Sequence, residues 1–269
     1  MTLIQIGILA IGGLSSGVLA GFLGIGGGVL LVPLLVQLGF APIQAAATSS
    51  LAILITATTG SFQNWRMGYL TPQRVVLLGI PALVTALIGT QVADKLPDYV
   101  LLAAFGGLLL SNLYLVGLKK RVVAQRQHSL SEREAQSESY SPARLTPLTA
   151  RLVTGGVAGF MAGLFGVGGG VILVPLQILL LNESIKAAVR TSLGVIVITA
   201  ISACVGHALN GNVVWLAGLL LGLGGLVGVQ ISTRFLPKLA DQTVSLLFRT
   251  MLCLLTVYIF WQAWQAWQV

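Results

Sequence analysis

Long apolar stretches separated by short polar breaks run along the whole chain. Many of these stretches hold about 20 residues, the length that a helix needs to cross the ~30 Å hydrocarbon core of a bilayer. They predict helical spans at residues 3–23, 43–63, 72–93, 99–118, 148–165, 185–206, 213–233 and 243–265, with shorter apolar pieces at 28–40 and 170–182. The pattern therefore predicts an all-α polytopic membrane protein of about eight to ten helical segments, with eight full spans' worth of helix including the short pieces.

The two short pieces each begin at a cluster of three glycines. A piece of about 13 residues is near 20 Å long at 1.5 Å per residue, which is too short to cross a bilayer. Glycine lowers helix propensity by about 1 kcal/mol relative to alanine, and Pro33 and Pro175 each remove a backbone donor further along the piece. We expect half-helices broken at membrane depth, where irregular backbone is tolerated only if it is buried in protein or lines a wet cavity.

The broken segment occurs twice. Residues 21–34 (GFLGIGGGVLLVPL) and 163–176 (GLFGVGGGVILVPL) are identical at 10 of 14 positions. Continuing the alignment places 48–51 on 190–193, so that Arg190 falls opposite Thr48, and further along it pairs Asn64 with His207 and Gln91 with Gln230. The repeat predicts a duplicated bundle with a first transmembrane repeat at 1–118, a polar linker at 119–147 and a second transmembrane repeat at 148–269.

Composition and charge agree with a membrane protein. Hydrophobic residues make up 56% of the chain and charged residues only 8%, whereas a soluble domain usually carries about 25% charged residues. Mean hydropathy is +0.94. Seven of the fifteen basic residues lie within 119–151, beside three of the seven acidic ones. This excess predicts a linker held in the cytoplasm and a lipid bilayer as partner, and it does not indicate a nucleic-acid partner.

The few charges in the loops bear on the orientation of the repeats. If each broken pair traverses the membrane twice, the loop with Arg66 and Arg74 lies inside, the loop with Asp94 lies outside, and the two repeats are inverted. If the broken pair is a re-entrant hairpin or crosses only once, we expect parallel repeats. The positive-inside rule favours the inverted arrangement.

The glycine clusters are the strongest candidates for a site. A helix that starts at each cluster would point its amide N–H groups and its positive end at one anion. The alternative is close helix packing through small residues. Hydroxyls near the start of 43–63 and 185–206, together with one guanidinium, are further anion donors. The candidate substrate-binding residues are Gly26, Gly27, Gly28, Ser49, Ser50, Gly168, Gly169, Gly170, Arg190, Thr191 and Ser192.

Each of these additional donors also has a structural interpretation. Serine and threonine hydroxyls bond back to the preceding helical turn or hold helices together. Arg190 is placed to act as a basic anchor at the membrane surface. His207 and its repeat partner Asn64 are a candidate proton or polar gate, or else polar caps at span ends.

Groups for catalysis or metal binding are missing from the predicted spans. Asp94, Asp98, Glu183 and Asp241 all fall in predicted loops, and no serine lies in a nucleophile elbow. Cys204 and Cys253 lie apart in apolar segments, as buried small hydrophobes do. We therefore predict a protein that is not an enzyme and that needs no cofactor and no metal.

The two glycine segments, GIGGGVLLVP and GVGGGVILVP, carry a family resemblance. Together with the small-residue and hydroxyl patches that follow them and the HxxxGxVxW pattern at 207–215, they resemble the sulfite exporter TauE/SafE family of membrane permeases. The resemblance covers the chain apart from the central linker. It implies movement of anionic sulfur compounds or organic acids, such as sulfite and sulfonates, across the cytoplasmic membrane.

The expected function is a transporter for small anions in a bacterial-type inner or plasma membrane. One half would rock against the other around an anion site at the repeat interface. A passive anion channel is the main alternative, and a non-transport membrane subunit is a second one. The identity of the anion, the direction of transport, the coupling ion and the oligomeric state, including a homo-oligomer, stay open.

Overall fold

The computed structural model describes residues 3–111, 147–181, 183–240 and 242–247, with short pieces between 250 and 258. Apart from Pro147, the predicted linker lies outside the described residues, as do the end of the predicted span 99–118 and most of 243–265. Every regular element in the described ranges is a helix, as the pattern of apolar stretches predicted.

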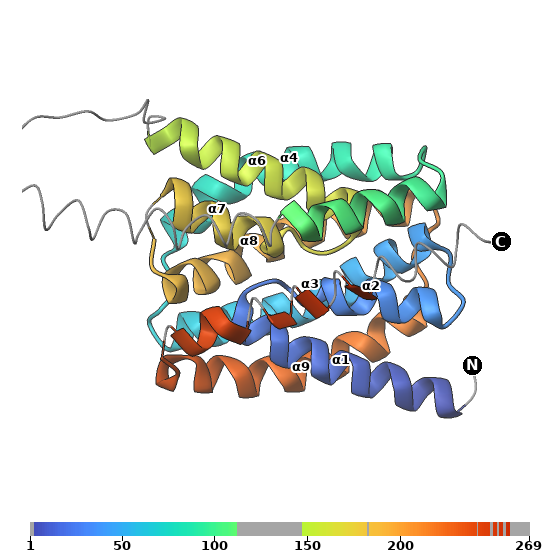
Figure 1. The fold of residues 1–269 in the computed structure, drawn as a ribbon, viewed down its shortest axis with the longest axis horizontal. Helices are drawn as coiled ribbons and strands as arrows, with labels where there is room; N and C mark the ends of the chain where they lie inside the picture. The colour runs from blue at the N-terminus through green and yellow to red at the C-terminus, as the bar shows by residue number, and fades with distance from the viewer. Residues whose placement is uncertain are drawn as a thin grey trace, which may run out of the picture.

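The helices begin and end within a few residues of the predicted positions. In chain order they are α1 (Leu3–Leu23), α2 (Gly28–Gln37), α3 (Pro42–Arg66), α4 (Pro72–Ala93), an unlabelled helix (Asp98–Ser111), α6 (Pro147–Phe165), α7 (Gly170–Leu180), α8 (Ile185–Leu209) and α9 (Trp215–Phe235), which continues into a 3-10 turn at Leu236–Lys238 (Figure 1). Six of those described are long and apolar enough to cross a membrane, namely α1, α3, α4, α6, α8 and α9. The prediction of a polytopic helical membrane protein is confirmed.

The two short helices fold back on the helices that precede them. Ser16 in α1 donates a hydrogen bond of 3.0 Å to the carbonyl of Gly27, and Gly12, one turn earlier, packs against Leu34 near the other end of α2. In the other half, Gly169 packs against the carbonyl of Ala158. Each broken pair is therefore a hairpin of one long and one short helix.

The halves of the sequence exchange helices. Helix α1 lies parallel to α9, with Gly13 and Gly17 against the backbone of Leu221 and Gly225. Helix α6 lies against α4 in the same way. Two four-helix layers result, visible in Figure 1: the α1–α9 bundle (α1, α2, α3, α9) and the α4–α6 bundle (α4, α6, α7, α8). Each bundle contains helices from both halves, so the halves are not separate bodies that could rock against each other.

Corresponding helices of the two halves run in opposite directions. In Figure 1, α1 begins on the right beside the N-terminus, whereas α6 begins on the left. Inverted repeats would produce this arrangement. The expectation that a re-entrant hairpin makes the repeats parallel was wrong. A hairpin that enters and leaves the membrane on the same side does not reverse the direction of the helices that follow it, so it does not by itself make the repeats parallel.

Reciprocal contacts correct the alignment of the halves. Ser49 bonds to the carbonyl of Gly166, and Ser192, 143 residues further along, bonds to that of Gly24. In this register the counterpart of Arg190 is Ala47, not Thr48. The one-residue shift arises because α7 has 11 residues and α2 has 10.

The equivalence of Gln91 and Gln230 was also wrong. A Cβ on Gly163 would lie 3.0 Å from the amide nitrogen of Thr90, and a Cβ on Gly21 would lie 3.1 Å from that of Thr233. Thr90 and Thr233 are therefore counterparts, which shifts the two glutamines by one helical turn. The sequence alignment failed here because glycines recur at four-residue spacing in α9, so a register displaced by one turn matches similar residues.

Charged residues gather at opposite ends of the bundle. At one end, Arg74 forms an ion pair of 3.0 Å with Glu183, and the Lys186 ammonium lies 3.4 Å from the carbonyl of Pro237. At the other end, beyond the last turn of α4, Asn212 donates a hydrogen bond of 2.8 Å to Asp94.

Candidate functional site

Two glycine loops interrupt the helices at the centre of the molecule. We define them as residues 24–28 and 166–170. Gly26 and Gly27 have φ of 76° and 82°, and Gly168 and Gly169 have φ of 80° and 76°. This left-handed backbone is accessible to glycine at little cost and ends a helix. The predicted interruptions are therefore present in both halves.

The two loops lie against each other. A Cβ on Gly28 would lie 2.6 Å from the Cα of Val167, and a Cβ on Gly170 would lie 2.7 Å from the Cα of Ile25. All ten loop residues are buried. Helices α2 and α7 therefore start side by side, one from each bundle, and their positive ends share one region.

The amide N–H groups of the glycines are donors without acceptors. The first hydrogen bonds of α2 run from Leu30 and Leu31 to the carbonyl of Gly27. Within the part of the chain that the structure describes, no group accepts from the amides of Gly26, Gly27, Gly28, Gly168, Gly169 and Gly170. A buried donor left unpaired costs about 1–3 kcal/mol. Donors at a buried helix start are ordinarily satisfied by side chains, by water or by a ligand.

The hydroxyls near the loops hold the loop carbonyls. Ser49 donates to Gly166 and Ser192 to Gly24, both at 2.6 Å. Thr199 donates to Gly168 at 3.0 Å. With these carbonyls engaged, the loop backbone is held and the amides are left available. Sequence reasoning missed Thr199, and also Ser16 beside Gly27, because a hydroxyl inside an apolar span carries no sign of its partner.

Other predicted donors lie elsewhere. Ser50 bonds back to the carbonyl of Ala46 at 3.0 Å, as its structural interpretation supposed. Thr191 is buried in α8 beside Ser192. The Arg190 guanidinium stacks on the ring of Tyr69, with 3.8 Å between Cζ and the ring centroid. The structure thus directs Arg190 toward the turn between α3 and α4 and not toward the glycine loops.

Two isoleucines fill the space between the loops. Cβ atoms added to Gly26 and Gly168 would each lie 3.1–3.2 Å from the Cγ2 atoms of both Ile53 and Ile196. These side chains come from the middle of α3 and α8 and are fully buried. They pack against the Cα atoms of Gly26 and Gly168, where the two loops meet. Their sequence context is that of ordinary core residues, so no signal singled them out.

The candidate gate residues lie far apart. Asn64 lies in the last turn of α3, at the end with Arg74, and His207 lies in the last turn of α8, at the opposite end. The Nε2 atom of His207 is 3.0 Å from the carbonyl of Gly163. Its Nδ1 atom and both amide atoms of Asn64 are buried without a partner in the described structure. Asn64 and His207 therefore lie at opposite ends of the bundle and do not form one gate.

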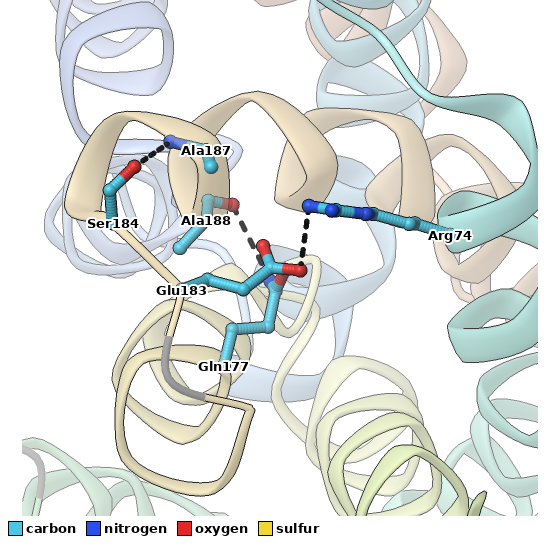
Figure 2. A network of polar contacts seen from close by, with 6 residues as sticks. All are labelled: Arg74, Gln177, Glu183, Ser184, Ala187 and Ala188. Atoms are coloured by element: carbon cyan, nitrogen blue, oxygen red, sulfur yellow. Dashed lines mark hydrogen bonds and ion pairs between the residues drawn. The ribbon is translucent and has the colours of Figure 1, made fainter. Parts of the chain in front are cut away.

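A polar network ties the turn after α7 to α4 (Figure 2). The Nε2 atom of Gln177 donates to the carbonyl of Ala188 at 3.4 Å, and Arg74 reaches the Glu183 carboxylate from α4. Because all these residues belong to the α4–α6 bundle, the network braces that bundle internally. Among the described residues there is no cluster of three or more histidine, cysteine, aspartate or glutamate side chains that could hold a metal ion.

Comparison with known proteins gives a match over nearly the whole chain. The family described as "Sulfite exporter TauE/SafE" matches residues 9–259. The "Probable membrane transporter protein YunE" of Bacillus subtilis is 26% identical over 265 residues, covering 95% of this chain and 97% of the relative. The "Probable membrane transporter protein MJ0441" of Methanocaldococcus jannaschii is 26% identical, covering 76% and 73%.

A plant relative matches a shorter part. The "Sulfite exporter TauE/SafE family protein 2" of Arabidopsis thaliana is 38% identical over 82 residues, which cover 30% of this chain and 18% of the relative. No solved structure matches the chain significantly.

Proposed function

Because the chain belongs to the sulfite exporter TauE/SafE family, we propose that it carries small anions such as sulfite, sulfonates or related organic anions across a membrane by alternating access. The coarser function, that of a multi-pass membrane transporter, follows from the family and from the six described helices long enough to span. The names of the relatives describe membrane transporters and exporters, and they support a transport role.

The six unpartnered amides of the glycine loops carry the proposal. Backbone N–H groups at two helix starts stabilise an oxyanion without a permanently buried cation. The loops are central and buried, and each is braced by a hydroxyl of the other half. Discontinuous helices whose positive ends face the substrate's anionic group are a recurring arrangement in transporters built from inverted repeats.

Alternating access requires two bodies that move. We assign these bodies to the α1–α9 and α4–α6 bundles, which meet along α3 and α8 and at the glycine loops. Ile53 and Ile196 close the central contact and would separate when substrate enters. In this scheme the repeats 1–118 and 148–269 are inverted.

The basic end of the bundle gives the orientation. Arg66, Arg74, Lys186 and Lys238 belong to loops or helix ends at the same end as the start of α6. By the positive-inside rule we place this end, and with it the linker 119–147, in the cytoplasm of a bacterial-type cell.

The site is tested by a matched pair of glycine variants. Alanine at Gly26 (φ 76°) and alanine at Gly39 (φ 89°) have a similar backbone cost, because both residues are left-handed. A Cβ on Gly26 would contact Ile53 and Ile196 between the glycine loops, whereas a Cβ on Gly39 would have no atom within 4 Å. Purified protein is screened for thermal stabilisation by small anions. A ligand at ~100 times its dissociation constant adds about 2.7 kcal/mol. We expect Gly26→Ala to lose this stabilisation and Gly39→Ala to keep it. Equal retention in both variants would move the site elsewhere.

Transport itself is tested in proteoliposomes. A carrier that alternates access exchanges labelled for unlabelled anion across the membrane, so substrate loaded inside drives uptake of labelled substrate from outside. We expect such counterflow for the anion that stabilises the protein. Flux without counterflow would favour the passive channel, and neither flux nor counterflow would favour a non-transport subunit.

A further inference from the structure

A hollow of about 410 Å³ lies between the ends of α3 and α9, away from the glycine loops. Its walls are formed by seven side chains of these two helix ends and the residue that follows α3: Thr59, Phe62, Gln63, Arg66, Met67, Gln230 and Arg234. Both helices end on the left in Figure 1, at the basic end of the bundle. The hollow belongs entirely to the α1–α9 bundle.

Two guanidinium groups give the hollow a positive charge. No carboxylate is among the residues that line it. Arg66 lies over the ring of Phe62 with 5.2 Å between Cζ and the centroid, and Gln63 is held by a hydrogen bond of 3.1 Å to the carbonyl of Gln230. Paired arginines with planar donor groups suit a phosphate or another oxyanion.

The surroundings of the hollow are apolar and exposed. Phe62 and Trp65 are 51% and 59% exposed, and Ile231 and Phe235 on α9 are 46% and 50% exposed. In a membrane protein such side chains face lipid, with aromatic residues at the level of the head groups. Asn64, which faces the protein interior, is not part of the hollow. The hollow therefore opens toward the bilayer and not toward the central path.

The repeat does not account for these residues. In the register set by the reciprocal hydrogen bonds, the counterparts of Arg66 and Arg234 are Leu209 and Gln91, and the counterpart of Gln63 is Gly206. The basic hollow therefore occurs at one end only, the end that we place in the cytoplasm. Helix packing common to both halves does not require two arginines here.

We propose that this hollow binds the phosphate group of an anionic phospholipid of the cytoplasmic leaflet. Arg66 and Arg234 hold the phosphate, the second N–H of the Gln63 side-chain amide adds a polar contact, and the acyl chains lie along the exposed apolar side chains of α3 and α9. The bound lipid would fasten the end of α3 to that of α9.

The test counts lipids bound to the full-length protein in detergent. Protein is incubated with an equal mixture of phosphatidylglycerol and phosphatidylcholine, and the lipids retained are counted by native mass spectrometry. A basic residue near a membrane surface contributes ~1 kcal/mol to anionic lipid binding, a factor of about five. We expect Arg66→Gln with Arg234→Gln to reduce phosphatidylglycerol retention by about 25-fold. Thr59→Phe, which fills the hollow without changing the charge, should reduce it as well.

The control removes two charges from the same end of the protein but from the other bundle. Arg74→Gln in α4 with Arg151→Gln in α6 should keep phosphatidylglycerol retention within about twofold of the unmodified chain, because neither residue lines the hollow. Equal losses in the two double variants would overturn the proposal in favour of general charge attraction. Full displacement of the lipid by millimolar glycerol phosphate would also overturn it, because the hollow would then be a site for soluble anions.

Discussion

Ser49 in α3 donates a hydrogen bond of 2.6 Å to the carbonyl oxygen of Gly166, which lies in the glycine loop of the other half of the chain. Ser192 makes the reciprocal bond to Gly24. Each loop is therefore held by a long helix from the opposite half. This arrangement links the two interruptions mechanically, so that a movement of α3 or α8 is transmitted to the loop backbone.

Removal of either hydroxyl should destabilise the protein. Ser49→Ala and Ser192→Ala each leave a buried loop carbonyl without its donor, and we expect each to cost about 1–3 kcal/mol. Thr58→Ala is the control, because Thr58 is exposed and bonds only to Leu54 in its own helix. It should change stability by less than about 0.5 kcal/mol. Thermal unfolding in detergent measures all three. Equal effects at Ser49 and Thr58 would show that the bond to Gly166 does not hold the loop.

The exchange of helices between the halves depends on small residues in α1. A methyl group on Gly17 would overlap the carbonyl of Gly225 and lie 2.7 Å from its Cα, so we expect Gly17→Ala to cost about 1–3 kcal/mol through overpacking. Gly7 in the same helix has nothing within 4 Å of a Cβ. Gly7→Ala should therefore be neutral or stabilising by up to about 1 kcal/mol. Chemical denaturation of both variants tests the packing. A Gly17→Ala variant as stable as Gly7→Ala would argue against close contact between α1 and α9.

Much of the fold was predictable from the sequence because a bilayer imposes helix length. Apolar stretches located the ends of α1, α4 and α6 to within about a residue, and the glycine clusters marked both interruptions. The pairing of α1 with α9 was not predictable, because glycine-rich helices can pack on several faces and the sequence does not say which. The same property produced the wrong equivalence of Gln91 and Gln230.

The site was predictable in its backbone and less so in its side chains. Positive φ at Gly26 and Gly168 follows from glycine clusters in apolar surroundings. By contrast, Arg190 was aligned one residue out of register, and its stacking on Tyr69 depends on the turn between α3 and α4. Ile53 and Ile196 resemble any core residue until the two halves are brought together.

His207 offers a test of proton coupling. Histidine is the side chain whose charge ordinarily changes between pH 5 and 8. Glutamine retains a donor for the carbonyl of Gly163 but does not titrate in this range. If His207 carries a proton during transport, anion flux should depend on pH in the unmodified protein, and His207→Gln should remove most of that dependence. The measurement is initial flux into proteoliposomes between about pH 5 and pH 8. An unchanged pH profile in the variant would place any proton coupling elsewhere.

Contacts at the ends of the helices provide a test of alternating access. Lys186 in α8 reaches the carbonyl of Pro237 beyond α9, so this contact joins the α4–α6 bundle to the α1–α9 bundle. Asn212 donates its amide to the carbonyl of His207 at the end of α8 and bonds to Asp94 after α4, so that contact lies within the α4–α6 bundle. If the two bundles must separate at the end with Lys186, tying that end should stop transport. In a background with Cys204→Ala and Cys253→Ala, the pair Lys186→Cys and Pro237→Cys is joined with a short reagent that forms a disulfide with each thiol. We expect flux to fall at least tenfold and to return on reduction. The pair Asp94→Cys and Asn212→Cys, treated in the same way, is the control and should keep its flux, as should each single-cysteine variant. Full flux with Lys186→Cys tied to Pro237→Cys would mean that this end does not open, which a fixed pore or a different hinge would explain and the rocking of two bundles would not.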